Sequence, residues 1–222
     1  MNRAPVRALF FDVGGTLIEP WPSVGAIYAD VARRHGLSCD AQRVERSFRE
    51  SWAALKTPGL TVSCKDWWRE LVFRTLGQRN EECFAELFEL FSHAKVWRVF
   101  PDVKETLQEA RRRGWYVGVI SNWDERLRPL LQETGLTAWF DSMTISCEVG
   151  VEKPDVKIFQ AALRVSGVSP QETVHVGDSY EEDVRGAEAA GIRAILINRK
   201  DGSVAGCASV RDLRDVLRFV AG

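Results

Sequence analysis

The chain shows two kinds of hydrophobic pattern. Val6–Phe11 is a short, mostly apolar run, which is typical of a buried strand, and it ends in the tight turn Asp12–Thr16. From Glu19 to about Trp97, apolar residues instead recur at intervals of three and four, which is the period of an amphipathic helix. The first strand is therefore followed by a long helical block.

Turn-forming residues divide this block. They interrupt the helical pattern at Gly36, at Thr57-Pro-Gly59 and at Gly77. We expect three or four helices here and no strands.

After Pro101, strand patterns alternate with helix patterns. The expected strands are Trp115–Ile120, Met143–Ser146, Thr173–Val176 and Ile192–Ile197. The expected helices are Val103–Arg113, Glu125–Thr134, Asp155–Ser166, Glu181–Ala190 and Val210–Val220. Such alternation implies right-handed crossovers and a parallel sheet.

The pattern as a whole predicts an α/β fold with a Rossmann-like parallel sheet flanked by helices. We assign residues 1–18 and 98–222 to this core and residues 19–97 to an inserted, all-helical cap. The 222 residues, 45% of them hydrophobic, suffice for a core domain with one insertion.

Composition excludes several classes of function. The formal net charge of −1 gives no overall attraction to nucleic acid or to an acidic membrane surface. No apolar run approaches the ~18 residues of a membrane-spanning helix, and no signal peptide is apparent before the first strand. The five cysteines are widely spaced without a C-x-x-C pair, so they indicate reduced thiols in a cytoplasmic protein.

Chemically competent side chains follow the expected strands. They are Asp12, Ser121, Asn122, Lys153, Asp178 and Asp183. In an open parallel sheet, ligands bind beyond the carboxyl ends of the strands, so we expect these groups to meet in one crevice.

The charges in this crevice point to a metal ion. Asp12, Asp178 and Asp183 bring three negative charges together, and Lys153 supplies one positive charge. Like charges ~4 Å apart repel by several kcal/mol at an effective dielectric near 20. Mg²⁺, which prefers carboxylate, water and phosphate oxygens, would relieve this repulsion and allow a phosphate to approach.

Four segments in order carry a resemblance to a known family. They are Phe10–Leu17, Val119–Asn122, Glu148–Pro154 with Ile158-Phe159, and Val176–Asp183 with Gly186-Ala187 and Ala190-Gly191. The chain resembles the haloacid dehalogenase-like (HAD) hydrolase superfamily, which consists largely of Mg²⁺-dependent phosphatases. The helical block lies where some members carry a cap after the first motif.

The resemblance implies roles for the residues of the crevice. Asp12 would be the nucleophile that forms an aspartyl-phosphate, and Lys153 would neutralise the transferring group. Thr16 and Ser121 would bind the phosphoryl oxygens, and Asn122 would help to position the loop.

The resemblance also implies a set of metal ligands. Asp12, Asp178 and the backbone carbonyl of Gly14 would hold Mg²⁺, with Asp183 binding directly or through water. Gly14 departs from the family pattern, because phosphatases of this family carry a second Asp there as general acid and base. Loss of such a group typically costs about 10²–10⁴ in rate.

Three functions are therefore weighed. The first is a phosphatase acting on a small phosphorylated molecule, whose turnover Gly14 would weaken. The second is a binding or regulatory protein that keeps the site without turnover. The third is a 2-haloacid dehalogenase-like hydrolase, whose relatives also lack the second Asp and use no metal but have a different fourth motif.

Other polar and aromatic residues are interpreted as structural. His175 alternates with valines in a strand, which favours a core or sheet-face histidine over a ligand. Trp67 and Trp68 are interpreted as core residues, and Arg111–Arg113 as the exposed end of a helix.

Overall fold

The computed structural model describes residues 4–55, 65–200 and 206–220. The expected break at Thr57-Pro-Gly59 lies outside these residues. The chain divides into two compact units: Met1–Ile18, Val99–Asn122 and Gly135–Gly222 form the first, and Glu19–Arg98 with Trp123–Thr134 form the second.

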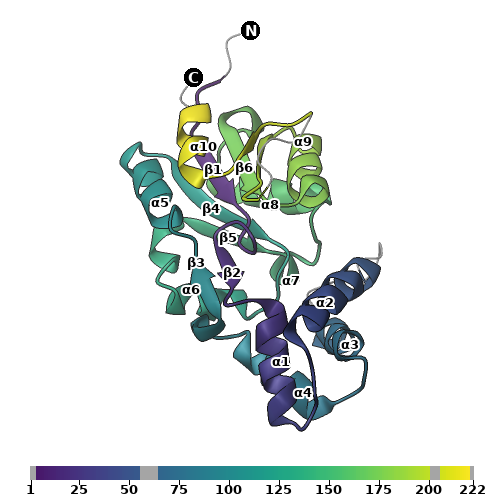
Figure 1. Cartoon of the computed structure of the whole chain (residues 1–222). Coiled ribbons are helices and arrows are strands. Elements are labelled where there is room, and N and C mark those ends of the chain that lie inside the picture. The colour runs from purple at the N-terminus through teal and green to yellow at the C-terminus, as the bar shows by residue number, and fades with distance from the viewer. Residues whose placement is uncertain (1–3, 56–64, 201–205, 221–222) are drawn as a thin grey trace. The chain divides into compact units, whose positions relative to one another are not determined.

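The first unit contains a six-stranded sheet in the order β5-β4-β1-β6-β7-β8, in which all neighbours are parallel (Figure 1). The strands are β1 (Ala8–Phe11), β4 (Tyr116–Ser121), β5 (Ser142–Ile145), β6 (Thr173–Gly177), β7 (Arg193–Ile197) and β8 (Ser209–Val210). This arrangement confirms the predicted Rossmann-like α/β fold.

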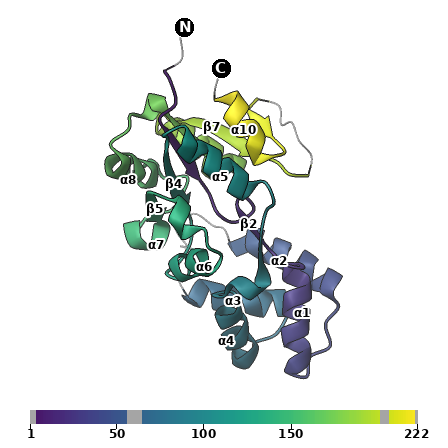
Figure 2. The same cartoon turned by 90° about the vertical axis from the view of Figure 1, so that its left-hand side faces the viewer.

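Helices cover both faces of this sheet, as Figure 2 shows from the side. They are α5 (Val103–Arg112) and α10 (Leu213–Phe219), and α8 (Val156–Ser166) and α9 (Gly186–Ala189). The core against α8 and α9 includes Phe10, and it requires Gly118 on the neighbouring strand. A Cβ at position 118 would lie 2.4 Å from the Phe10 ring.

Shorter helical elements connect these layers. They are η2 (Thr137–Trp139), α7 (Ser146–Val149), η3 (Pro170–Glu172) and the π-helical turn η4 (Tyr180–Arg185). The helix expected over Glu181–Ala190 is thus a π-helical turn followed by the short α9. The start of the last expected helix is wrong, because Ser209–Val210 pairs with β7 and Asp212 caps α10 by accepting from the Arg214 amide.

The second unit is built from helices. They are α1 (Val24–Arg34), α2 (Ala41–Leu55), α3 (Lys65–Leu76), α4 (Glu81–Leu90), η1 (Ala94–Val96) and α6 (Leu127–Glu133). As expected, Gly36 and Gly77 end helices, and both adopt a left-handed φ, at 76° and 72°. Trp67 is buried against Leu55 and Leu71, with Trp68 partly buried beside it, so both tryptophans pack as core residues.

Two short strands lie where the chain passes between the units. β2 (Ile18–Pro20) and β3 (Trp97–Val99) pair in a two-stranded sheet. The expectation of a stretch without strands is therefore wrong at its two ends. Among the described residues, no helix combines the length and apolar character that crossing a membrane requires.

Arg126 connects Trp123–Thr134 to α4 of the second unit, whereas the sequence predicts this segment in the core. Its guanidinium pairs with Asp124 at 2.6 Å, lies 3.7 Å from the ring centre of Phe88 and donates to the Phe88 carbonyl at 3.0 Å. Arg126 and Asp124 are 8% and 2% exposed. A buried ion pair with satisfied hydrogen bonds thus anchors α6 to α4.

An ion pair between a buried aspartate and a partly buried arginine supports the turn after β1. Arg199 donates to both carboxylate oxygens of Asp102, at 2.9 and 3.2 Å, and to the Thr16 carbonyl at 2.7 Å. Asp102 also accepts the Leu213 amide at 2.8 Å, at the start of α10. The pair therefore ties the loop after β1 to the beginnings of α5 and α10.

We predict that Arg199→Met lowers the free energy of unfolding by about 3 kcal/mol, because it leaves the buried charge of Asp102 without its partner. Chemical denaturation measures this loss. Arg112→Met is the matched control, since Arg112 pairs with Glu109 on the surface and its loss should leave the midpoint unchanged. Equal midpoints for the two variants would show that the Arg199 pair contributes no net stability.

Candidate active site

Asp12 lies at the carboxyl end of the central strand β1. The register that pairs Phe11 with Val119 on one side and Val176 on the other continues into Asp12, whose amide donates to the Val176 carbonyl at 2.9 Å. Its carboxylate Oδ1 accepts from Ser121 Oγ at 2.9 Å and from Lys153 Nζ at 2.7 Å. The ends of β1 and β4 therefore bring an acid and a hydroxyl together, and the loop before α8 adds a cation.

The turn after Asp12 depends on glycine. Gly15 has a left-handed φ of 74°, and a Cβ there would lie 2.3 Å from Asp178 Oδ2. Gly14 is not among the glycines with positive φ, and it forms a bridge with Ile18. The hydroxyl of Thr16 is buried and has no hydrogen-bond partner among the described residues.

Asn122 positions Lys153 through the backbone. Its Oδ1 accepts the Lys153 amide at 2.7 Å, and its Nδ2 donates to the Lys153 carbonyl at 3.0 Å. This double contact fixes the lysine at the end of its loop. The Lys153 ammonium is buried and donates to both Asp12 and Asp183, the second at 2.5 Å.

The π-helical turn η4 carries Asp183 back over β6. The Val184 amide reaches the Ser179 carbonyl at 3.3 Å, and the Ser179 amide donates to Asp183 Oδ2 at 3.0 Å. A Cβ at Gly177 would lie 2.0 Å from the carboxyl carbon of Asp183, so the strand needs glycine where this carboxylate lies. π-Helical turns of this kind often occur at functional sites.

Three carboxylates converge here, as the sequence predicts. Asp12, Asp178 and Asp183 each offer an oxygen, and these oxygens lie within 4.8 Å of one another. Such a group could hold a metal ion, and carboxylate oxygens are the ligands that Mg²⁺ prefers.

The ionisation of the three acids differs because their surroundings differ. Burial raises the pKa of Asp12, although Lys153 opposes this shift. Asp178 is exposed as a residue, but loss of hydration at its carboxylate and the charges of Asp12 and Asp183 raise its pKa to about 8. Burial also disfavours the charged form of Asp183, yet Lys153 and His175 hold its pKa below the ordinary value. Asp12 and Asp183 thus share the Lys153 ammonium, and the negative charge of Asp178 is the least compensated of the three.

The structure brings together most of the residues that the sequence predicts. Hydrogen bonds connect Asp12, Ser121, Lys153, Asn122 and Asp183, and Asp178 lies within the acidic cluster. Thr16 and Gly14 lie in the turn that follows Asp12.

His175 is a contact of this site that sequence reasoning missed. It is fully buried in β6, as a core histidine would be, but its Nε2 lies 2.8 Å from Asp183 Oδ1. The available signal was its position two residues before Gly177, which places both residues on one face of the strand.

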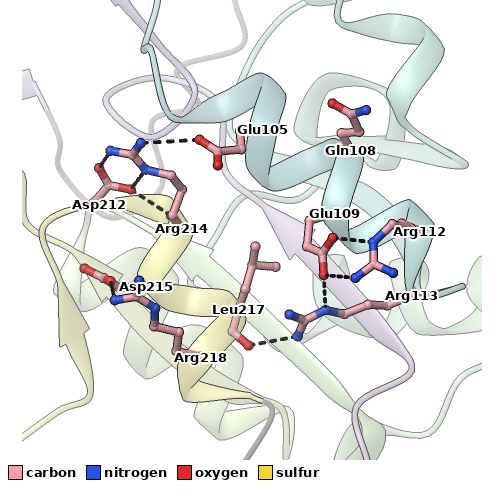
Figure 3. Close-up of a pocket in the computed structure, with 10 residues that line it drawn as sticks. All are labelled: Glu105, Gln108, Glu109, Arg112, Arg113, Asp212, Arg214, Asp215, Leu217 and Arg218. Atoms are coloured by element: carbon pink, nitrogen blue, oxygen red, sulfur yellow. Dashed lines mark hydrogen bonds and ion pairs between the residues drawn. The ribbon is translucent and has the colours of Figure 1, made fainter.

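A separate depression on the first unit lies between α5 and α10 (Figure 3), with a volume of about 670 Å³. Its lining consists of Glu105, Gln108, Glu109, Arg112, Arg113, Asp212, Arg214, Asp215, Leu217 and Arg218. All four arginines pair with carboxylates of the same lining. These charges are therefore compensated without a ligand.

Comparisons with known proteins identify the family of this chain. The family of haloacid dehalogenase-like hydrolases matches residues 6–191. The human haloacid dehalogenase-like hydrolase domain-containing protein 3 is 35% identical over 88% of this chain and 83% of its own length. A phosphoserine phosphatase from Thermus thermophilus is 33% identical over 95% of this chain and 98% of its own.

Solved structures share the same fold. A HAD phosphatase from Thermococcus onnurineus has a TM-score of 0.73 at 27% identity, covering 98% of this chain and 99% of its own. A 2-haloacid dehalogenase from Pseudomonas syringae has a TM-score of 0.69 at 26% identity, covering 97% and 98%. The chain is a hydrolase-family protein with a Rossmann-like core, and it belongs to the haloacid dehalogenase-like hydrolases.

The raised pKa of Asp178 predicts a pH dependence of the metal-free protein. Its pKa of about 8 in the folded protein exceeds the ~3.9 expected after unfolding, so the folded state binds this proton more tightly. The contribution of the protonated Asp178 carboxyl to the free energy of unfolding is complete below about pH 4 and is lost as the pH rises toward 8. In a buffer that contains a chelator, Asp178→Asn should therefore unfold at a higher urea concentration than the wild type at pH 8.

The matched control for this measurement is Glu50→Gln, which removes an exposed carboxylate from α2. It should follow the wild-type profile. A wild-type midpoint that falls no further than that of Asp178→Asn between pH 5 and pH 8 would contradict the assigned electrostatics.

Proposed function

We propose that this protein is a Mg²⁺-dependent phosphatase that acts on a small phosphorylated molecule through an aspartyl-phosphate at Asp12. The observation that carries the proposal is that the Asp12 carboxylate accepts a hydrogen bond from the Lys153 ammonium and belongs to an acidic cluster whose oxygens lie within 4.8 Å of one another. Family membership and relatives named as phosphatases support it.

Asp12 would act as the nucleophile. Ser121 and Lys153 both donate to Oδ1, which orients the carboxylate. Lys153 would also neutralise charge on the transferring phosphoryl group, and the hydroxyls of Thr16 and Ser121 would bind its oxygens. Asn122 would keep Lys153 in place through its backbone contacts.

The acidic cluster fits Mg²⁺ by its donor set. Asp12, Asp178 and the Gly14 carbonyl would be direct ligands. Both oxygens of Asp183 already accept hydrogen bonds, from Lys153 and His175 at Oδ1 and from the Ser179 amide at Oδ2, which favours a contact through water. When bound, Mg²⁺ would offset the repulsion between the carboxylates and the incoming phosphate.

Two alternatives differ from the proposal in one observable each. A dehalogenase-like hydrolase would work without a metal, whereas the acidic cluster favours one. A binding or regulatory protein would keep the metal but show no turnover, and Gly14 is the feature that favours it. Metal dependence and turnover therefore separate the three functions. A cytoplasmic location stays a prediction of the sequence.

We predict that wild-type protein binds Mg²⁺ in calorimetry and that Asp178→Asn abolishes this binding. Asp12→Asn should remove p-nitrophenyl phosphate hydrolysis, because an amide is not a nucleophile here. Glu50→Gln serves as the control for both measurements. Equal Mg²⁺ binding by wild type and Asp178→Asn would exclude this metal site, and hydrolysis without Mg²⁺ would favour the metal-free alternative.

Gly14 predicts a preference among substrates. An alkoxide leaving group needs a proton, and a side chain at position 14 would be placed to give it, whereas aryl and acyl phosphates leave as more stable anions. We therefore expect hydrolysis of p-nitrophenyl phosphate and acetyl phosphate to be faster than that of sugar phosphates. Equal rates on an alkyl and an aryl phosphate would mean that another residue supplies the proton.

Restoring an acid at this position provides a direct test. Gly14→Asp should raise turnover, by up to about 10²-fold on alkyl phosphates, because it supplies a general acid and base. Gly14→Asn is the matched control, since it has a similar size but no proton to exchange. The left-handed φ of the turn is at Gly15, so position 14 does not demand glycine on that ground. A gain equal in the two variants would contradict a proton-transfer role.

A further inference from the structure

His175 and Gly177 form one surface beneath Asp183. Side chains alternate along a strand, so these two residues of β6 lie on the same face. The absence of a Cβ at Gly177 lets the Asp183 carboxyl lie over the strand, where a Cβ would approach its carbon to 2.0 Å. His175 then lies beside one oxygen of that carboxylate.

The contacts of the imidazole are one-sided. Nε2 lies 2.8 Å from Asp183 Oδ1, whereas Nδ1 is buried and has no hydrogen-bond partner among the described residues. Phe159 packs against the ring edge to face, with ring centres 5.3 Å apart at 84°. This arrangement fits a ring that carries a proton on Nε2 and donates it to Asp183.

Packing alone does not explain a histidine here. The side chain is fully buried, and burying a polar ring without a hydrogen bond costs free energy that an aliphatic side chain avoids. Among the described residues, the hydrogen bond that offsets this cost is the one with Asp183, an acid of the candidate metal cluster. Carboxylates at metal sites commonly depend on such outer hydrogen bonds for their orientation.

We propose that His175 is a positioning residue, whose Nε2–H fixes Asp183 Oδ1 beside Lys153 so that the acidic cluster is preorganised for Mg²⁺. This inference rests on the Mg²⁺ site of the proposed function. Lys153 at 2.5 Å and the Ser179 amide at 3.0 Å donate to the same carboxylate, so His175 is the third hydrogen-bond donor to Asp183.

The test compares two substitutions of similar length. His175→Gln keeps an N–H donor near the position of Nε2, and His175→Met fills the space without a donor. Titration with magnesium chloride in a calorimeter should show Mg²⁺ affinity about 10- to 100-fold weaker for His175→Met and close to wild type for His175→Gln. Thermal unfolding in chelator identifies folded variants.

The outcomes separate this inference from the proposed function. Wild-type affinity in a folded His175→Met variant would overturn the role of His175 alone, as would equal weakening in both variants. An absence of Mg²⁺ binding by the wild-type protein would instead contradict the metal site of the proposed function.

A measurement on the unsubstituted protein covers the case in which His175→Met does not fold. The chain has three histidines, so long-range ¹H–¹⁵N NMR spectra can report the state of each ring. His175 should carry its proton on Nε2. A ring protonated on Nδ1 alone could not donate to Asp183, and that result would overturn the inference.

Discussion

The candidate site depends on the two ion pairs that the Lys153 ammonium makes with carboxylates. The ammonium is buried and lies 2.7 Å from Asp12 and 2.5 Å from Asp183, so one positive charge serves two carboxylates. Burial of its carboxylate, together with the charges of Asp12 and Asp183, raises the pKa of Asp178 to about 8, and Lys153 offsets only part of this shift. The geometry therefore holds a surplus of negative charge at the carboxyl ends of the strands. That surplus is the physical reason to expect a divalent cation there.

The rest of the first unit holds these groups in place. Parallel pairing of β1 with β4 and β6 brings Asp12 next to Ser121 and to the turn that carries Asp178. Small residues allow the close approaches, with Gly15 facing Asp178 and Gly177 facing Asp183. Arg199 donates a hydrogen bond to the Thr16 carbonyl, which fixes the turn after β1. Asp12 and its partners are therefore fixed by backbone geometry as much as by their own contacts.

Sequence reasoning predicted the fold and most of the candidate site because both depend on local patterns. Strand ends followed by Asp12 or Asp178 are visible in a single sequence, and parallel topology brings such ends together. The assignment of Trp123–Thr134 was not visible, because it depends on Arg126 contacting Phe88, 38 positions away. His175 was missed for the same reason, since its neighbours in the strand indicate burial and only the fold reveals Asp183 beside it.

Gly14 connects the site to its chemistry. In the proposed mechanism Asp12 is the nucleophile and Lys153 the cation, but position 14, where the phosphatases that the chain resembles carry the acid and base, has no side chain. In the proposed mechanism, formation of an aspartyl-phosphate needs little proton transfer when the leaving group is a good one, whereas its hydrolysis needs an activated water. We therefore expect the covalent intermediate to form readily and to break down slowly.

The most direct test of the central claim is mass spectrometry of protein quenched in acid after mixing with acetyl phosphate and Mg²⁺. We expect one added phosphoryl group on the peptide that contains Asp12 when Mg²⁺ is present. This group should be absent in the presence of a chelator and in Asp12→Asn. Turnover of acetyl phosphate without a phosphoryl group on Asp12, or with one on another residue, would contradict the central claim.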